Sequence, residues 1–135
     1  MIEPFKVQVR FSDLDVLGHV TNSVYLSYFE AARVYYFKHL LKKDWDWSTD
    51  SVLVVKSEVE YIQPILLHDG PEVELYTKHI GSKSFTFGYK ILVNDVVYSK
   101  GASTLVAFDV SAQSTVPIKP DMLEVLEKLK KDELD

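Results

Sequence analysis

Residues 10–37 read RFSDLDVLGHVTNSVYLSYFEAARVYYF and join a polar first half to a nearly continuous apolar second half. From residue 23 to residue 42 the chain contains no Gly or Pro, and this predicts one long helix. Apolar side chains lie nearly all round that helix, and only Ser27, Glu30 and Arg33 form a narrow polar stripe. A helix of this kind is typically buried. The rest of the chain must therefore supply the elements that wrap it.

The rest of the chain alternates apolar and polar residues in several runs, as strands do. These runs predict strands over residues 5–11, 52–62, 72–80, 84–93 and 96–108. The connections between the last four are too short for parallel crossovers, so the sheet should be antiparallel. A short C-terminal helix is predicted from Pro120, because acidic residues come first and lysines follow, as the helix dipole favours. The predicted class is α+β, with one long central helix wrapped by a curved antiparallel sheet.

Length and composition indicate one globular domain, residues 1–135, with 47% apolar residues to build a core. The net charge of -5 argues against general nucleic-acid binding. The absence of cysteine excludes disulfides and thiolate metal sites, and it fits a reducing compartment. The start of the sequence lacks the apolar region of a signal peptide, and no apolar run approaches about 20 residues. We therefore expect a cytoplasmic protein without nucleic-acid or membrane partners.

A sheet that covers a single helix leaves its outer face and its edges without cover. Several large side chains fall on that outer face of the predicted strands: Tyr76, Ile80, Tyr98, Val106 and Phe108. A second copy of the chain is the simplest cover for such a surface. We therefore expect a homo-oligomer, either a homodimer or a homotetramer.

The polar loop before the predicted helix holds the residues best suited to chemistry, namely Asp13, Asp15, His19 and Asn22. Asp15 is the carboxylate nearest the helix start, where backbone N–H groups could polarise a carbonyl and stabilise an oxyanion. It is then a general base or a nucleophile, whereas the alternative is an ordinary cap of a turn or of the helix. His19 either orients a substrate carbonyl or packs through local hydrogen bonds, and Asn22 or Ser23 is most simply an N-cap. The spacing of the two aspartates and His19 matches no standard metal motif.

Three further polar residues have open interpretations. Glu30 either pairs with Arg33 three residues later or faces an active site. Lys83 and Ser84 follow Gly81 at the start of a predicted strand, where an ammonium, a hydroxyl and free N–H groups suit a phosphate. The alternative for these two residues is an ordinary solvated turn.

The pattern R-F-x-D-x-D-x-x-G-H-V-x-N-x-x-Y-x-x-Y-x-E-x-A-R, matched by residues 10–33, resembles the 4-hydroxybenzoyl-CoA thioesterase-like acyl-CoA thioesterases of the hotdog fold. The predicted order of elements agrees with that fold over essentially the whole chain. The resemblance implies that Asp15 is the catalytic aspartate and that the backbone amide near Asn22 polarises the thioester carbonyl. It also implies that Lys83 and Ser84, in the element K-S-F, bind the nucleotide end of CoA.

The resemblance further implies hydrolysis of an acyl-CoA thioester to a carboxylic acid and free CoA, with no metal or organic cofactor. The pantetheine arm would thread between two subunits, and the acyl end would lie against helix aromatics such as Tyr25, Tyr28 and Phe29. One alternative is an acyl-ACP thioesterase, although Leu17 and Thr21 depart from the related string of the plant enzymes of that kind. Another alternative is a non-catalytic hotdog protein that binds acyl-CoA.

Overall fold

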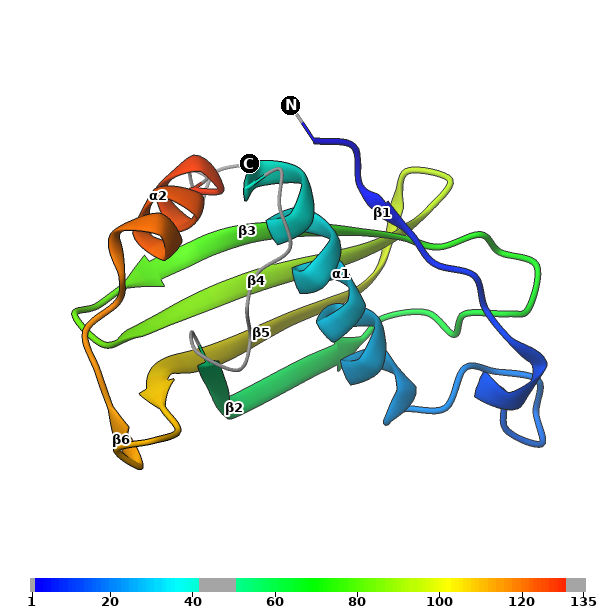
Figure 1. The fold of residues 1–135 in the computed structure, drawn as a ribbon. Coiled ribbons are helices and arrows are strands. Elements are labelled where there is room, and N and C mark those ends of the chain that lie inside the picture. The colour runs from blue at the N-terminus through cyan, green and yellow to red at the C-terminus, as the bar shows by residue number, and fades with distance from the viewer. Residues whose placement is uncertain (1, 42–50, 131–135) are drawn as a thin grey trace.

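The computed structural model describes residues 2–41 and 51–130 (Figure 1). In chain order its elements are β1 (Phe5–Lys6), the 3-10 helix η1 (Phe11–Asp13), α1 (Val24–Leu41), β2 (Ser51–Tyr61), β3 (Glu72–Ile80), β4 (Ser84–Val93), β5 (Val96–Asp109), β6 (Ser114–Thr115) and α2 (Pro120–Lys128). The bounds of α1 and of β2 to β5 agree with the predicted ranges to within a single residue. Local patterns in the sequence therefore place the long elements correctly.

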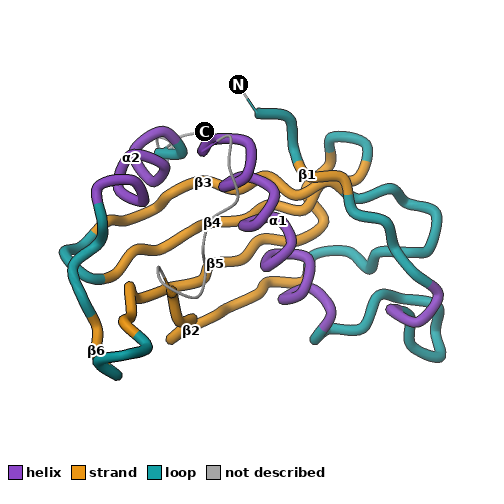
Figure 2. The backbone as a smooth tube through the Cα atoms, in the orientation of Figure 1, coloured by secondary structure: helices purple, strands orange, loops and turns teal. Residues whose placement is uncertain are grey.

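One antiparallel sheet forms the body of the molecule, in the strand order β1-β3-β4-β5-β2, and β6 pairs with the end of β5. α1 crosses one face of this sheet, and α2 lies near the end where β3 finishes (Figure 1 and Figure 2). The predicted α+β class is confirmed. A curved antiparallel sheet around one long helix is the hotdog fold.

The core lies between α1 and the face of the sheet that α1 crosses. Alternate side chains of β4 point into it, and the fully buried ones are Phe85, Phe87, Tyr89 and Ile91. Phe29 of α1 stacks on Tyr89, with 4.2 Å between the ring centroids. Gly101 of β5 permits this close approach, because a Cβ there would lie 2.5 Å from the Phe29 ring. The helix is thereby fixed over β4 and β5.

The predicted strand over residues 5–11 is mostly wrong. Only β1 pairs with β3, and the ladder stops where Val7 would face Pro71. The Val7 N–H still donates to the Pro71 carbonyl at 2.9 Å, but Pro71 has no N–H to return. Farther along, the chain tightens into η1, where the Asp13 side chain accepts the Arg10 N–H at 3.0 Å. The alternating pattern therefore reflects a mostly unpaired segment rather than a long strand.

Within a single chain, α1 is buried along the side that faces the sheet. The buried side chains of the helix are Tyr25, Tyr28, Phe29, Ala32, Tyr36 and Phe37. Leu26 and Val34 are exposed although they are apolar. The helix therefore keeps apolar surface that a ligand or a second subunit could cover.

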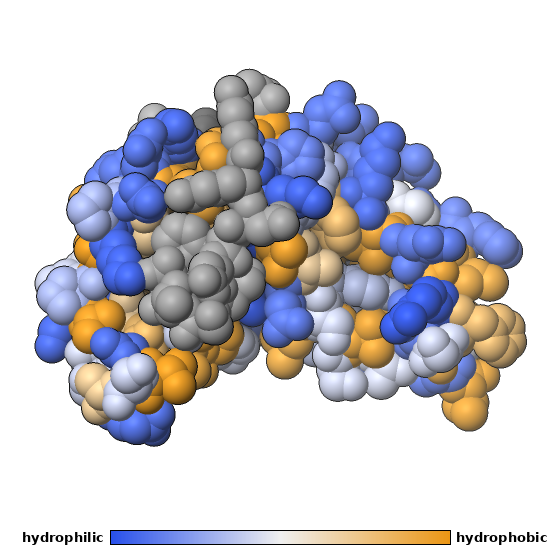
Figure 3. All heavy atoms as spheres, viewed as in Figure 1, coloured by the Kyte–Doolittle hydropathy of each residue, from blue (hydrophilic) through white to orange (hydrophobic). Residues whose placement is uncertain are grey.

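Large apolar side chains are also exposed at the end of the molecule that carries η1 (Figure 3). These are Phe11, Val16 and Leu17, on η1 and on the loop that follows it. An apolar patch of this kind marks a contact surface for a protein, a ligand or a membrane. Across residues 2–41 and 51–130, no helix has the length and the apolar character needed to cross a membrane.

Candidate active site

Asp15 lies at the start of a tight turn that its own side chain closes. Its Oδ1 accepts the Leu17 N–H at 2.9 Å and the His19 N–H at 3.1 Å, and the Asp15 N–H donates to the His19 carbonyl at 2.8 Å. Gly18 completes the turn with a φ of 77°, which glycine adopts at little cost. The side chain is exposed, and Oδ2 accepts no hydrogen bond from the residues that the structure describes. One carboxylate oxygen is therefore fixed, and the other is open to a water or a ligand.

Asp13 is the buried member of the aspartate pair. Its Oδ2 accepts the Tyr28 hydroxyl at 2.8 Å and the Arg10 N–H at 3.0 Å, and its carbonyl accepts the Thr21 N–H at 2.9 Å. Burial, and then the hydrogen bond to Asp13, raises the pKa of the Tyr28 phenol. Asp13 therefore ties the loop to α1, and Asp15 is the aspartate whose carboxylate stays accessible.

The start of α1 leaves backbone donors unused. The Val24 N–H donates to the Thr21 carbonyl at 2.9 Å, and the Tyr25 N–H donates to the Asn22 carbonyl at 3.4 Å. The N–H groups of Asn22 and Ser23 reach no acceptor in the described part of the chain. No side-chain cap by Asn22 is seen there either. The first N–H groups of a helix carry a partial positive charge, so this helix start suits a developing oxyanion.

His19 and Tyr25, the two predicted site residues with rings, differ in access. The His19 imidazole is half-buried and makes no hydrogen bond within residues 2–41 and 51–130. Tyr25 lies in the core, where burial raises its pKa, and its ring contacts the edge of Tyr61 with 4.8 Å between centroids. The Tyr61 hydroxyl donates to the Asn22 carbonyl at 3.0 Å. Tyr61, which the sequence analysis missed, therefore links Tyr25 to the helix start.

Lys83 and Ser84 lie at the opposite end of the sheet from Asp15. The turn between β3 and β4 carries them, whereas Asp15 follows η1 at the other end (Figure 1). The turn is well ordered by backbone bonds, since the Gly81 N–H donates to the Ser84 carbonyl at 2.7 Å and the Ala107 N–H donates to the Lys83 carbonyl at 2.9 Å. One chain therefore does not bring these residues to the aspartate.

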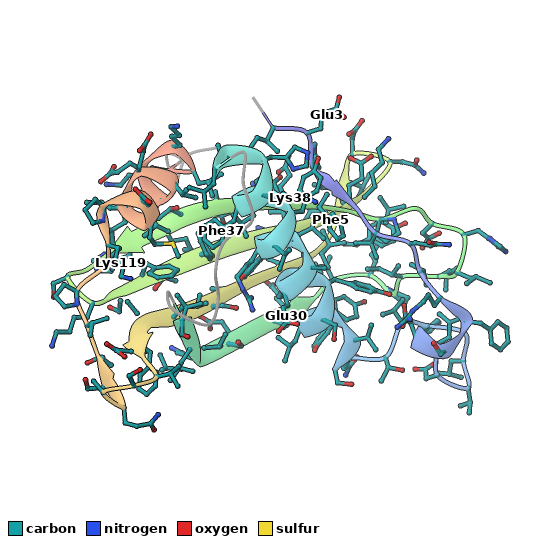
Figure 4. The ribbon with its side chains drawn as sticks, in the orientation of Figure 1. Glu3, Phe5, Glu30, Phe37, Lys38 and Lys119 are labelled. Atoms are coloured by element: carbon teal, nitrogen blue, oxygen red, sulfur yellow. The ribbon has the colours of Figure 1, made fainter. Side chains whose placement is uncertain are left out.

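Glu30 and Arg33 lie on α1, beyond the loop that carries Asp15 (Figure 4). Glu30 Oε2 is 3.9 Å from Arg33 Nη2, which agrees with the predicted i,i+3 pair. Arg33 Nη1 also donates to the Tyr89 hydroxyl at 2.9 Å, a contact that the sequence analysis missed. An inward-facing tyrosine on a buried strand needs a partner for its hydroxyl, so such a contact could have been sought.

The site thus combines an open carboxylate oxygen and free amide donors on one short segment. Leu14 pairs with Val20 in an isolated bridge, which holds the two arms of that segment together. Within the described ranges, no group of three or more His, Cys, Asp or Glu side chains could hold a metal ion. Such a set can deliver a water or a carboxylate to a carbonyl and stabilise the charge that forms on its oxygen.

Known proteins are similar to this chain in sequence and in fold. A family model of the thioesterase-like superfamily matches residues 9–126. The crystal structure of a thioesterase from Thermus thermophilus, complexed with coenzyme A and Zn, is 34% identical, covers 96% of this chain and 97% of that chain, and has a TM-score of 0.80. A putative esterase from Aquifex aeolicus is 30% identical over 127 residues, which are 90% of this chain and 95% of that protein.

A shorter match joins the chain to an uncharacterised protein of Bacillus subtilis, 33% identical over 84 residues. These are 62% of this chain and 56% of that protein, so the match spans little more than half of that relative. The family match instead covers most of the chain, and it confirms the resemblance seen in residues 10–33. The chain therefore belongs to the thioesterase-like superfamily and is a thioester hydrolase of the hotdog fold.

Proposed function

We propose that the protein hydrolyses acyl-CoA thioesters, with Asp15 as general base or nucleophile and the start of α1 as the site that holds the carbonyl oxygen. The observation that carries this proposal is the open Oδ2 of Asp15 on the same short segment as the N–H groups of Asn22 and Ser23, which find no acceptor among the described residues. Hydrolysis of an activated carbonyl needs a base and oxyanion donors of this kind. The structure of the Thermus relative, a complex with coenzyme A, supports CoA esters as the substrate class.

Two routes use the same carboxylate. In the general-base route, Asp15 takes a proton from a water whose oxygen attacks the thioester carbon. The amide donors at the start of α1 stabilise the resulting oxyanion. The C–S bond then breaks, which releases the carboxylic acid and the CoA thiolate. The thiolate takes the proton from Asp15. In the nucleophilic route, Asp15 attacks the carbon itself, CoA departs, and water hydrolyses the mixed anhydride.

Other predicted site residues would support these steps. The His19 imidazole has no described partner, so it would be free to orient the carbonyl. Tyr25 would act as a positioning residue, because its contact with Tyr61 supports the hydroxyl that holds Asn22. Glu30, exposed on α1, would line the path of the substrate. Asn22 would contribute its backbone amide.

The edge strand β2 supports a dimer as the working unit. β2 has 11 residues and ends the sheet, and in the described part of the chain it is paired only with β5. Leu53, Val54 and Val55 are exposed on it. A long edge strand that exposes apolar side chains is a ready template for pairing with another chain. Antiparallel pairing of β2 with its copy would extend the sheet across a two-fold axis.

That two-fold axis would bring the two halves of the site together. It reverses the strand direction in the second subunit, so the copy of the β3–β4 turn would lie at the end of the molecule that carries Asp15. The pantetheine arm would then run between subunits, with Lys83 and Ser84 of one subunit serving the aspartate of the other. Lys83 is exposed and would contact phosphate at the nucleotide end of CoA.

Thiol release from a panel of aliphatic and aryl CoA esters tests the hydrolase proposal. The chain contains no cysteine, so a thiol reagent reports product alone. We expect turnover by the wild type and a loss of roughly a thousandfold in kcat for Asp15→Asn. Thermal unfolding should be unchanged, because the Asn oxygen can still accept the two turn hydrogen bonds. No turnover with any ester, together with stabilisation by CoA, would instead indicate a binding protein.

Mixing two variants tests the shared site. Lys83→Ala should raise the KM for CoA esters more than it lowers kcat, because it removes uniform binding. A mixture of refolded Asp15→Asn and Lys83→Ala subunits should then regain a low-KM activity that neither variant has alone, since each heterodimer holds one intact site. Mixing without such a gain would place both residues in the same subunit's site. Equal KM values for CoA esters and pantetheine esters would show that Lys83 does not bind the nucleotide end of CoA.

A further inference from the structure

Arg33 is a nearly buried cation whose acidic neighbour in the described ranges is distant and solvated. Its side chain is 11% exposed, and its one acidic neighbour in the described part of the chain, Glu30, lies 3.9 Å away and is 75% exposed. An ion pair of that length with a solvated carboxylate is weak. Removing a guanidinium from water is costly unless its charge is compensated, so this position calls for a further partner.

Among the residues that the structure describes, few of the Arg33 donors find an acceptor. A guanidinium has five N–H donors. Within residues 2–41 and 51–130, one hydrogen bond is made, from Nη1 to the Tyr89 hydroxyl at 2.9 Å. Tyr89 is fully buried and its ring stacks on Phe29, so its hydroxyl holds the guanidinium in a fixed place. The remaining donors are therefore available, in a defined orientation, for an oxygen ligand.

The side of α1 that carries Arg33 faces β4 and β5. Phe29, Arg33 and Phe37 are spaced four residues apart and share this side. Phe29 packs against Gly101 of β5, and Phe37 lies 5.9 Å from Phe87 of β4 between ring centroids. Two rows of paired residues cross the sheet here, Tyr89 with Gly101 and then Phe87 with Ser103. Arg33 therefore lies between these two rows along the helix.

The second of those rows is polar as it approaches β2. Phe87 pairs with Ser103 of β5, and Ser103 pairs with Ser57 of β2. The Ser57 and Ser103 hydroxyls lie 3.4 Å apart. β2 itself is exposed over most of its length. Toward β2, the hydroxyl groups of Ser103 and Ser57 therefore make this row of the sheet polar.

The distance from the helix start defines what could reach Arg33. Long side chains on a helix lean toward its N-terminus, which brings the guanidinium to the level of Glu30, as the pair between them indicates. From Asn22 to Glu30 the helix rises on the order of 10 Å. An acyl group of about that length, held by its carbonyl at the start of α1, would therefore span the axial distance to Arg33.

We propose that Arg33, oriented by Tyr89, selects acyl groups that carry an oxygen acceptor at the end remote from the thioester. A terminal carboxylate and a phenolic hydroxyl share this chemistry, and an unsubstituted alkyl chain lacks it. When substrate binds, a charge-assisted hydrogen bond between this oxygen and the Arg33 guanidinium would then offset the cost of burying the guanidinium. The inference rests on the proposed hydrolase function and gives it a substrate class. Arg33 acts here as a specificity residue, since the reaction at the carbonyl does not involve it.

Two matched pairs of esters test this inference: octanedioyl-CoA against octanoyl-CoA, and hydroxynaphthoyl-CoA against naphthoyl-CoA. The wild type should show a kcat/KM at least about tenfold higher for the oxygen-bearing member of one pair. The pair that shows the preference identifies the acceptor as carboxylate or phenol. Arg33→Met should abolish the preference while turnover of the plain ester persists. Tyr89→Phe should weaken it several-fold, and this variant keeps the test valid if Arg33→Met does not fold.

Lys38→Met is the matched control, because Lys38 is an exposed cation on the same helix (Figure 4). This variant should keep the wild-type ratio within each pair. If Arg33→Met lowers turnover of both members equally, Arg33 only holds the helix to the sheet and the inference is overturned. A wild-type preference for the plain esters overturns it as well. No turnover of any ester overturns the hydrolase proposal itself, which is a distinct result.

Discussion

Asp13 and Asp15 lie two residues apart, and the fold gives them opposite surroundings. Asp13 is 7% exposed and accepts hydrogen bonds from Arg10 and from Tyr28, fifteen residues away on α1. Asp15 is exposed, and among the described residues it accepts hydrogen bonds only from its own turn, through one oxygen. The buried Asp13 carboxylate is engaged by a contact with a distant segment. The exposed Asp15 carboxylate is held by its own turn, and its second oxygen has no partner among the described residues. A catalytic carboxylate needs that second arrangement, because it must be both positioned and accessible.

The two aspartates also depend on each other. Asp13 fastens the loop to the helix, and its carbonyl accepts the Thr21 N–H just before α1 begins. The turn of Asp15 is closed by its own bonds, but its place relative to the helix start follows from the anchor at Asp13. Removing either carboxylate should therefore have a different main consequence, on stability for Asp13 and on turnover for Asp15.

The largest expected effect on stability is that of Asp13→Ala. Truncation leaves the buried Tyr28 hydroxyl and the Arg10 N–H without their acceptor, which should lower the free energy of unfolding by about 3 kcal/mol. Asp15→Ala removes hydrogen bonds at the surface and should cost less than about 1 kcal/mol. Urea unfolding of the two variants and the wild type measures both values.

A double-mutant cycle with Tyr28→Phe isolates the buried contact. The hydroxyl and the carboxylate are 2.8 Å apart, so their coupling free energy should be at least about 1 kcal/mol. Additive effects of the two substitutions would mean that the contact is not what holds the loop. Equal losses of stability in Asp13→Ala and Asp15→Ala would erase the difference between the two aspartates.

The fold was largely predictable because its long elements follow local rules. The alternation of residues 72–80 and 84–93 identified β3 and β4 with the bounds that the structure has. The error at residues 5–11 has a long-range cause, since the ladder ends at Pro71, more than sixty residues away. A pattern within one segment gives no information on the strand that will lie beside it.

A further prediction concerns Gly18, which shapes the Asp15 turn and not the Asp13 anchor. Its φ of 77° is unfavourable for a residue with a Cβ, although a Cβ there would meet nothing within 4 Å. Gly18→Ala should therefore cost only the backbone term, about 1 to 2 kcal/mol in the free energy of unfolding. Urea unfolding measures the loss, and thiol release shows whether turnover falls with it.

Gly18→Asn is the matched control, because asparagine tolerates the left-handed region better than alanine does. It should retain more stability and more turnover than Gly18→Ala. If both variants are as stable as the wild type, the turn is not strained by a side chain and the geometry around Asp15 is looser than the structure indicates.

The candidate site was predictable only in part, for the same reason as the fold. The sequence placed Asp15, His19 and Asn22 on one loop, since they are close in the chain. The burial of Asp13 depends on Tyr28, and the orientation of Arg33 depends on Tyr89 across the core. Lys83 lies a sheet length away from Asp15 because of the antiparallel order of β3 and β4. The local sequence pattern does not indicate this separation. Contacts between distant segments decide which polar residues meet.

The smallest effect is expected from the ionisation of Tyr28, which reports on the buried anchor alone. Burial, and then its hydrogen bond to Asp13, raises the pKa of Tyr28 above the ordinary value of 10.0. The folded protein therefore keeps this proton at pH values where the unfolded chain has lost it. Stability is unaffected below about pH 10 and falls as the pH rises past that value. Between about pH 10 and about pH 11, the free energy of unfolding of Tyr28→Phe should fall by about 1 kcal/mol less than that of the wild type.

Urea midpoints over this pH range, for the wild type and Tyr28→Phe, measure how steeply the stability of each protein falls with pH. Some alkaline loss should remain in the variant, because burial also raises the pKa of Tyr36, to about 12. Tyr36→Phe should therefore reduce the slope independently, without touching Asp13. Parallel curves for the wild type and Tyr28→Phe would mean that water reaches the Tyr28 hydroxyl. Asp13 would then be as accessible as Asp15, and burial could no longer distinguish the two aspartates.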